Sequence, residues 1–500
     1  MIRRTKELGK ISIPGALTPT EVCEAWDCGA DIVKMFPAGV LGLEYLKAVR
    51  GPLRHIPMCA VGGINPENIG LFLEAGIRCF GIGGNLVSVE AVRRGGFPQI
   101  DPSGPWLPPG HLPVAGKWEG REMSVVNDII KDIPIPNMVK VRQEFDRTRL
   151  EDVAAEVRKC LDRREILVNL RPGMTVAVAV GSRGISNHAL IVRETVRFLR
   201  DHGARPFIVS SMGSHGGATA EGQRAILEGY GIREEYCGCP IKAGTDCALI
   251  GYTGDGSPVY IDRYAAEADG IVLVNRIKPH TAFRGPYESG LMKMMAIGLG
   301  KQKGAETCHA AGFENMAENI PRFAAAVLKN CNILAGIAIL ENAYDETREV
   351  IALAADEIPA QEPELLERAK RYMPRILVDY VDLLVVGQIG KNFSGDGMDP
   401  NIAGTFATKC ASGGLNTKRV AVLDISDESH GNGVGFGMAD VSTRRAYEKF
   451  DFEMSYPNAL TCLVSQVVKV PMIFDSDQLC LKAGIKLCAG IEHRNARVVY

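Results

Sequence analysis

Residues 175–184 read TVAVAVGSRG, and this stretch decides the fold. A short run of small and β-branched apolar residues that ends in a glycine turn is typical of a buried strand. Two more runs of this kind follow, RPFIVS at 205–210 and DGIVLVN at 269–275, and a helical pattern fills residues 188–204. Strands that alternate with helices predict an α/β domain built on a parallel sheet.

The same alternation continues in both directions. Residues 10–86 alternate between short apolar runs and helical patterns, with a helix start expected at Thr18 or Thr20. A helix is expected at 363–373, followed by strands at 381–387, 419–425, 461–466 and 470–474.

Residues 99–120 are rich in proline and glycine and have no periodicity, which predicts a linker. We therefore expect four parts. These are an α/β segment over 1–105, a linker over 106–122, and two α/β domains over 123–375 and 376–500, with the site between the two domains.

The composition excludes several classes of protein. A net charge of −2 leaves no excess of basic residues that would indicate binding to nucleic acid or to an anionic membrane. The 14 cysteines include no CxxC pair, so we expect free thiols in a reducing cytoplasm and no cysteine-based metal site. The apolar runs are too short to cross a bilayer.

Polar residues stand at the expected carboxyl ends of strands, where open α/β sheets bind ligands. Arg183 follows the strand at 175–180, and His215 lies in a glycine turn after the strand at 205–210. The segment that follows the strand at 269–275 adds His280, Lys293 and His309. Each residue alone could be a surface ion pair, a helix cap or a solvent-facing side chain. Their concentration beside glycine- and serine-rich turns favours a common site.

The motifs SRG, GSHGGATAEGQ, KPH and GLMK, followed by a histidine, resemble the nickel-pincer lactate racemase family. The resemblance covers about residues 123–500. In that family a pyridinium mononucleotide with two thio-acyl arms is attached through a thioamide to a lysine. It holds nickel through two sulfurs and a ring carbon, and a histidine supplies the fourth ligand. The resemblance implies five roles: Lys293 as the tether, His309 as the nickel ligand, His215 and His280 as acid/base groups, and Arg183 as the carboxylate-binding residue.

This resemblance implies a racemase or epimerase of a 2-hydroxy acid. Hydride would leave the substrate for the cofactor, and its return to the other face of the 2-keto acid would invert the centre. The implied partners are a small 2-hydroxy acid or sugar acid and separate cofactor-making proteins, and a homo-oligomer is left open. The non-enzymatic alternative is a ligand-binding module without cofactor.

The sequence departs from the family at several positions. Val180 stands where lactate racemases carry an aspartate, and Gly216 replaces an arginine. We assign the substrate-binding lysine of the C-terminal domain to Lys391, with Lys409 as the reserve and a surface role as the alternative for both. These changes alter the substrate pocket more than the metal site, so lactate is not the expected substrate.

A second set of motifs lies in the first hundred residues. Lys34 ends an apolar run in DIVKMFPAG, and a buried lysine can form a Schiff base, although a solvent-facing lysine is the alternative. The glycine turns VGGI at 61–64 and GIGGNL at 81–86 are of a kind that binds phosphate. Together these motifs resemble the C-terminal half of 2-keto-3-deoxy-6-phosphogluconate aldolase, a class I aldolase on a (β/α)8 barrel, over about residues 8–95. The resemblance implies Lys34 as the Schiff-base lysine without metal or cofactor, and a phosphate cradle of Gly62, Gly63, Gly83 and Gly84.

We expect no aldolase activity from this chain alone. The family's first half, with its catalytic glutamate and substrate arginine, has no counterpart before Met1, and Val61 replaces the usual threonine. Four strands cannot close an eight-stranded barrel. The alternative, a class I aldolase working through Lys34, is tested by assaying retro-aldol release of pyruvate. Robust turnover that Lys34→Ala abolishes would contradict our expectation.

Overall fold

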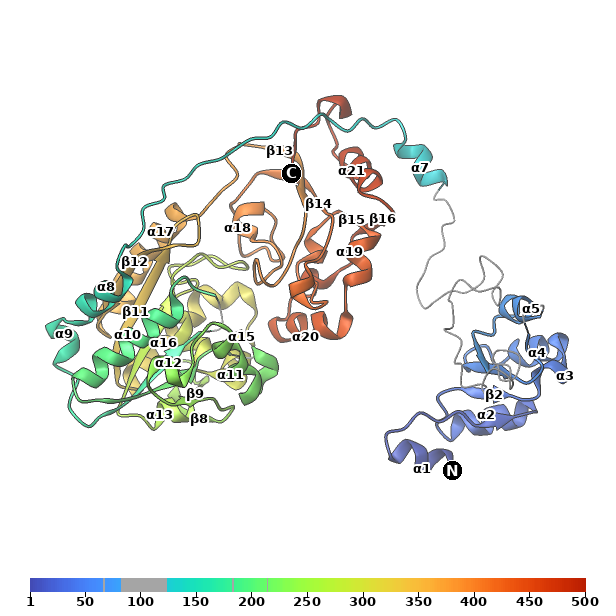
Figure 1. Ribbon diagram of the computed structural model, residues 1–500, viewed down its shortest axis with the longest axis horizontal. Coiled ribbons are helices and arrows are strands. Elements are labelled where there is room, and N and C mark those ends of the chain that lie inside the picture. The colour runs from blue at the N-terminus through green and yellow to red at the C-terminus, as the bar shows by residue number, and fades with distance from the viewer. Residues whose placement is uncertain (66–67, 82–123, 182–183, 214) are drawn as a thin grey trace, which may run out of the picture. The chain divides into compact units, whose positions relative to one another are not determined.

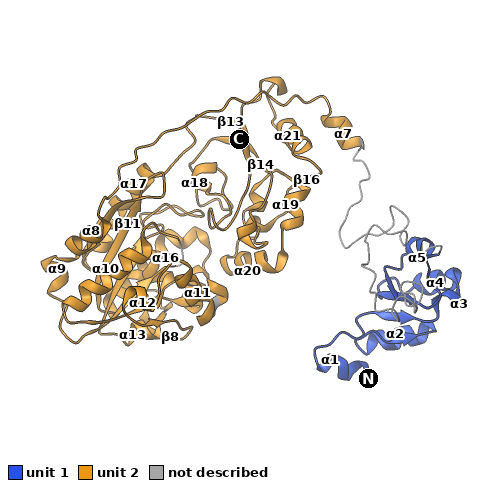
Figure 2. Cartoon of the chain, viewed as in Figure 1, with its two compact units in different colours: residues 1–124 blue, residues 125–500 orange. Residues whose placement is uncertain are grey.

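The computed structural model describes residues 1–65, 68–81, 124–181, 184–213 and 215–500. The chain divides into two compact units, residues 1–124 and 125–500 (Figure 2). The predicted linker at 106–122 lies outside the described residues. In the described ranges, no helix combines the length and the apolar character that a membrane crossing requires.

The first unit is one parallel sheet with helices packed against it. The strands lie in the order of the chain: β1 (Gly15–Ala16), β2 (Val33–Met35), β3 (Met58–Val61) and β4 (Cys79–Gly81). The helices are α1 (Ile2–Glu7), α2 (Pro19–Asp27), α3 (Ala38–Leu41), α4 (Leu43–Arg50) and α5 (Ile69–Glu74). Of the two expected helix starts, Thr18 is confirmed, because its side chain and that of Glu21 form a capping box. The four strands match the predicted half-barrel.

The edge of this sheet is apolar. Val33 and Met35 of β2 are buried with helix residues such as Val22 in a single core. Ile11 and Ile13, just before the edge strand β1, are 74% and 48% exposed. Among the described residues, no strand pairs with the outer side of β1. A half-barrel was expected to leave such an edge.

The second unit contains a six-stranded sheet in the order β12-β11-β10-β5-β6-β7, with helices on both faces (Figure 1). Its strands are β5 (Thr175–Val180), β6 (Arg205–Ser210), β7 (Ile241–Lys242), β10 (Gly270–Arg276), β11 (Ile333–Glu341) and β12 (Thr347–Leu353). All neighbouring strands are parallel except β11 and β12. The three strands predicted at its centre are confirmed to within one residue.

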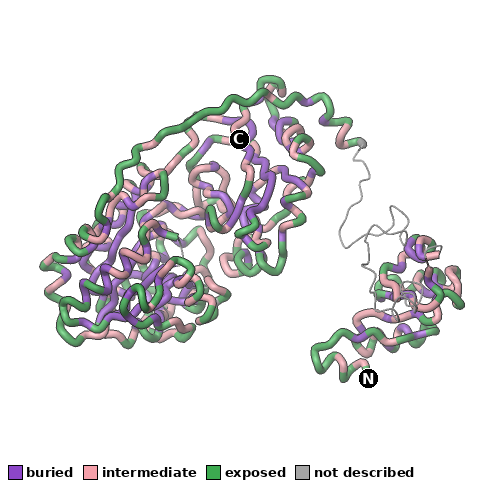
Figure 3. Tube along the Cα trace, in the orientation of Figure 1, coloured by how far each residue is buried: buried purple, intermediate pink, exposed green. Residues whose placement is uncertain are grey.

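The burial of strand β5 on both faces explains why its sequence is apolar throughout. Val176, Val178 and Val180 point into a core that includes α10 (His188–Asp201). Ala177 and Ala179 point into a second core, which includes α16 (Met316–Asn330). A strand with both faces covered has no solvent side, so no polar residue alternates along it. Buried residues accordingly follow the strands in Figure 3.

A second sheet of five parallel strands follows α17 (Glu357–Tyr372), in the order β16-β15-β14-β13-β17. Its strands are β13 (Val381–Val386), β14 (Thr417–Val422), β15 (Val441–Thr443), β16 (Met472–Phe474) and β17 (Val498–Val499). The strand expected at 461–466 is wrong. That stretch ends α20 (Phe452–Cys462) and begins a 3-10 turn at Ser465–Val468. Ala459 and Val467 pack there in a small separate cluster, and a short apolar run does not by itself distinguish strand from helix.

The segment that carries Lys293 and His309 is a broken helix. It consists of α14 (Leu291–Lys293), a π-helix at Met294–Gly298 and α15 (Lys301–His309). The break comes at Lys301, whose φ of +52° lies in the left-handed region. Met294 and Met295, 3% and 0% exposed, fix the π-turn in the core. π-turns are rare and frequently occur at functional sites.

The two sheets of the second unit meet through residues 278–284 and 399–412. Lys278 Nζ lies 3.0 Å from an Asp399 carboxylate oxygen, and the backbone N–H of Arg284 donates to the Cys410 carbonyl at 2.9 Å. The Arg284 guanidinium donates to Asn401 Oδ1 at 2.6 Å. A cavity of about 710 Å³ opens beside this junction, and Pro279, Arg284 and Asn401 are among its lining residues. The active site was expected between the two domains, but His280 is not among the residues that line this cavity.

Candidate active site

His309, at the end of α15, is held in one tautomer by a backbone carbonyl. Its Nδ1 lies 2.7 Å from the Ala305 carbonyl, which can only accept, so Nδ1 carries the proton and Nε2 keeps its lone pair. Burial, and secondarily the Lys293 ammonium, lower the pKa of His309. Both effects favour the neutral form of the ring. A histidine that ligates a metal typically donates its other ring N–H in this way.

Lys293 lies close enough to His309 for its charge to lower the pKa of that ring. In an unbroken α-helix, residues 16 positions apart would lie about 24 Å from each other. The π-helix and the left-handed Lys301 interrupt the α-helix between them. The two predicted cofactor residues therefore share one neighbourhood.

His280 reaches the same neighbourhood from the loop after β10. Its ring centroid lies 6.2 Å from that of Phe313, and the ring centroid of His309 lies 5.7 Å from that of the same phenylalanine. The backbone N–H of Ala282 donates to His280 Nδ1 at 3.0 Å. The neutral ring therefore carries its proton on Nε2.

His215 lies in a turn that packs on the broken helix. The turn follows β6 and precedes a 3-10 turn at Gly216–Ala218 and α11 (Ala220–Gly229). The N–H of Gly213 donates to the carbonyl of Gly298, the last residue of the π-helix, at 3.2 Å. Gly216 has φ +66°, and a Cβ there would lie 2.6 Å from the Gly222 carbonyl carbon. The backbone thus requires glycine where the family often has arginine.

A buried carboxylate fixes the backbone of His280. Glu288 is 1% exposed, and its Oε2 accepts the His280 N–H at 2.7 Å and an Arg284 N–H at 3.3 Å. Lys370 Nζ lies 3.1 Å from the other carboxylate oxygen, so two cations offset the buried charge. The sequence analysis missed Glu288, which lies eight residues from His280 in a loop without periodicity.

A second buried carboxylate lies at the start of the Lys293 helix. Glu362, from α17, is 1% exposed and accepts the N–H of Met292 at 2.9 Å. Burial raises the pKa of Glu362 to about 7, against the opposing effect of the Met292 and Leu291 N–H groups. Gly290 leaves space for this carboxylate, since a Cβ there would lie 2.2 Å from its Oε1. Glu362 was also missed, because in sequence it resembles a surface residue of an amphipathic helix.

The remaining predicted residues lie elsewhere or outside the description. Arg183 and the glycines Gly83 and Gly84 lie outside the described residues. Lys391 is half-buried in the loop after β13, where its Nζ donates to the Gly395 carbonyl at 2.6 Å. Lys409 is exposed. Their roles stay predictions.

In the first unit, Lys34 lies at the middle of β2, in register with Gly15 and Cys59 of the neighbouring strands. Its Nζ lies 5.4 Å from the centre of the Phe36 ring. Gly62 and Gly63 both have positive φ, at +87° and +77°. The Gly62 carbonyl accepts the Gly39 N–H at 2.7 Å, so this turn also serves packing. The Schiff-base and phosphate roles stay predictions.

The described residues contain no group of three or more His, Cys, Asp or Glu side chains placed to hold a metal ion. His309 keeps a lone pair on Nε2, and the charge of Lys293 acts on its ring.

Comparison with known proteins agrees with both sets of motifs. Residues 130–320 match the lactate racemase N-terminal domain, and residues 1–102 match the KDPG and KHG aldolase family. The chain joins an aldolase-like segment to a lactate racemase-like domain. Both resemblances drawn from the sequence are confirmed. The racemase-like match covers the segments of His215, His280, Lys293 and His309.

Two curated relatives are similar to a short part of the chain and are named as aldolases. The chain is 38% identical over 87 residues to the 2-dehydro-3-deoxy-6-phosphogalactonate aldolase of Escherichia coli, covering 17% of this chain and 42% of that protein. It is 39% identical over 87 residues to a probable enzyme of the same name from Rhizobium meliloti, covering 17% and 41%. The chain thus spans about two fifths of the length of these relatives.

Two solved structures are similar to separate parts of the chain. The lactate racemase apoprotein from Thermoanaerobacterium thermosaccharolyticum has a TM-score of 0.44 and 14% identity, covering 73% of this chain and 96% of that one. A structure described as native KDPGal has a TM-score of 0.17 and 37% identity, covering 18% and 43%.

The buried Glu362 predicts a pH-dependent stability. Between pH 4.5, its ordinary pKa, and about 7, the folded protein keeps a proton that the unfolded chain releases. Unfolding free energy should therefore fall as pH rises through this window, by on the order of 3 kcal/mol, and level off above it. Glu362→Gln keeps an acceptor for the Met292 N–H but cannot ionise, so it should flatten this decline.

Calorimetric melting between pH 5 and pH 8 measures the effect. Glu364→Gln is the matched control, because Glu364 is exposed on the same helix. Equal pH dependence of wild type and Glu362→Gln would show that Glu362 is not the titrating group.

Proposed function

We propose that residues 125–500 form a nickel-pincer-dependent racemase or epimerase of a 2-hydroxy acid. The observation that carries the proposal is the juxtaposition of Lys293 and His309 across the broken helix, with the His309 lone pair on Nε2. The match of residues 130–320 to the lactate racemase N-terminal domain supports it. Imidazole is a ligand that suits nickel.

Each residue would have a defined task toward the cofactor. Lys293 would carry it through a thioamide, and His309 Nε2 would supply the protein ligand to nickel. When bound, the cofactor supplies a centre that accepts a hydride from the substrate and returns it. The Ala305 carbonyl keeps the His309 ring in the tautomer that can ligate.

The histidines of the chain would handle the proton. A 2-hydroxy acid that loses hydride from C2 and the proton of its hydroxyl becomes a 2-keto acid, and return of both to the other face inverts the centre. His215 would take the hydroxyl proton at a ring nitrogen. His280 Nε2–H would donate a hydrogen bond to the C2 oxygen, and it must release the Ala282 N–H and change tautomer before it can act as the base.

Two chain regions would select the substrate. Arg183 would grip its carboxylate in a bidentate fork, and Lys391 would bind it from the C-terminal sheet. The loss of polar groups at Val180 and Gly216 argues against lactate. The adjoining aldolase-like segment favours a sugar acid, because aldolases of that family act on 2-keto acids.

The reaction is tested with C2-deuterated, enantiopure acids, namely lactate, glycerate and six-carbon aldonic acids. We expect protein loaded with cofactor to invert at least one of them, with deuterium retained at C2 because the same hydride returns. Product that carries solvent hydrogen at C2 would point to deprotonation and contradict the proposal. Loaded protein that inverts none of them would also contradict it and favour the ligand-binding module.

The metal role of His309 has a matched control within the chain. His202, at the end of α10, makes the same contact, with Nδ1 2.8 Å from the carbonyl four residues earlier, but it lies on the exposed end of its helix. His309→Ala should lose most of its nickel while Lys293 stays modified, and His202→Ala should keep both. Metal analysis and peptide mass spectrometry measure this. Unchanged nickel in His309→Ala would exclude the ligand role.

The acid/base roles predict a different outcome. His215→Asn and His280→Asn should retain cofactor and nickel but invert substrate about 10²–10⁴-fold more slowly, the usual contribution of a general acid or base. Chiral chromatography of the product measures the rate, with His202→Asn as the control. Either variant at full activity would remove that residue from the mechanism.

A further inference from the structure

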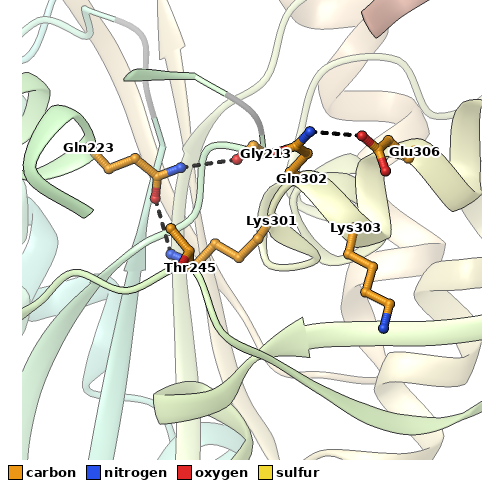
Figure 4. A pocket seen from close by; sticks show the side chains of 7 residues that line it. All are labelled: Gly213, Gln223, Thr245, Lys301, Gln302, Lys303 and Glu306. Atoms are coloured by element: carbon orange, nitrogen blue, oxygen red, sulfur yellow. Dashed lines mark hydrogen bonds between the residues drawn. The ribbon is translucent and has the colours of Figure 1, made fainter. Parts of the chain in front are cut away.

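A lysine is buried at the start of the helix that ends in His309. Lys301 is 2% exposed and, unlike most residues with a side chain, has φ +52°. Its Nζ lies 2.8 Å from Ser210 Oγ, 3.2 Å from Gln223 Oε1 and 2.9 Å from Asp262 Oδ2. It also donates to the Ser210 carbonyl. This cluster borders a cavity of about 190 Å³ (Figure 4).

The positive charge of Lys301 is compensated by the carboxylate of Asp262. Asp262 is fully buried, and its second oxygen, Oδ1, accepts the Ala265 N–H at 3.0 Å. A buried ion persists when it is paired with an opposite charge, as Lys301 is with Asp262. The Lys301 ammonium is therefore held in one position, and it orients the hydrogen-bonding groups beside it.

Gln223, from α11, links the Lys301 ammonium to the turn of His215 through hydrogen bonds. It is 1% exposed, and its Oε1 accepts from Lys301 and from Ser210 Oγ at 2.8 Å. Its Nε2 donates to the Gly213 carbonyl at 3.0 Å and to the His215 carbonyl at 3.3 Å. Figure 4 shows the amide between Gly213 and Lys301. The cation holds the oxygen, so both amide hydrogens face the turn.

We propose that Gln223 and Lys301 are positioning residues that hold the His215 turn in register with the helix of His309. The proposal rests on the proposed function, since it concerns the alignment of an acid/base group with a metal ligand. The two segments meet in this cluster, because Lys301 begins α15 and Gln223 spans the turn. A displacement of about 1 Å at such a group can cost about 10²-fold in rate.

The variant Gln223→Glu separates positioning from bulk stability. It keeps an oxygen for Lys301 but replaces the two N–H donors with an acceptor that faces the Gly213 and His215 carbonyls. Gln302→Glu is the matched control, because Gln302 borders the same cavity but is exposed and donates to Glu306.

Hydrogen–deuterium exchange and kinetics provide the measurements. For Gln223→Glu we expect at least tenfold faster exchange in the peptide that contains His215, with unchanged exchange at the end of α15, nickel content and Lys293 modification. In loaded enzyme, kcat should fall about 10–100-fold while KM changes less than about twofold. Gln302→Glu should match wild type throughout.

Unchanged exchange in the His215 peptide would overturn the proposal. So would faster exchange throughout the unit with an unaltered kcat, since that is the result of a structural role alone. If Gln223→Glu does not fold, Gln223→Leu, which removes the donors without adding charge, is measured in the same way. Wild-type protein without adduct or turnover would refute the proposed function, while the exchange experiment on that protein would still decide the role of Gln223.

Discussion

The packing that breaks one helix between Lys293 and His309 determines the rest of the site. Met294 and Met295 are buried in the core, the N–H of Leu299 bonds to the Met294 carbonyl at 2.8 Å in π-helical register, and Lys301 turns the chain. Without that break the two groups would stand at opposite ends of a rod about 24 Å long. With the break, the charge of Lys293 acts on the His309 ring and lowers its pKa. The buried methionine side chains fix this geometry, and the polar groups of the site lie on the segments beside them.

Much of the fold was predictable, because the central strands are buried on both faces and their sequences are apolar throughout, as in β5. The short patterns around the motif histidines and Lys293 singled these residues out, and their roles stay predictions. Glu362, Glu288 and Gln223 were not, because each acts through a contact that only tertiary structure makes, in the case of Glu362 across 70 residues. The stretch at 461–466 was misassigned because a few apolar residues pack equally well in a helix end.

The departures from the lactate racemase pattern have physical causes in the fold. Val180 is fully buried at the end of β5, so the aspartate of the family is replaced by part of an apolar core. Gly216 is required by a left-handed backbone that packs on α11. Both changes leave His309 and its Ala305 contact intact. The proposed racemase is accordingly expected to act on a substrate other than lactate.

Peptide mass spectrometry with metal analysis, on wild-type protein produced beside a pincer-cofactor biosynthesis pathway, tests this account most directly. We predict that the peptide containing Lys293 carries the cofactor mass and that the protein holds about one nickel per chain. An unmodified Lys293 and no nickel, in cells that load a known lactate racemase, would contradict the account.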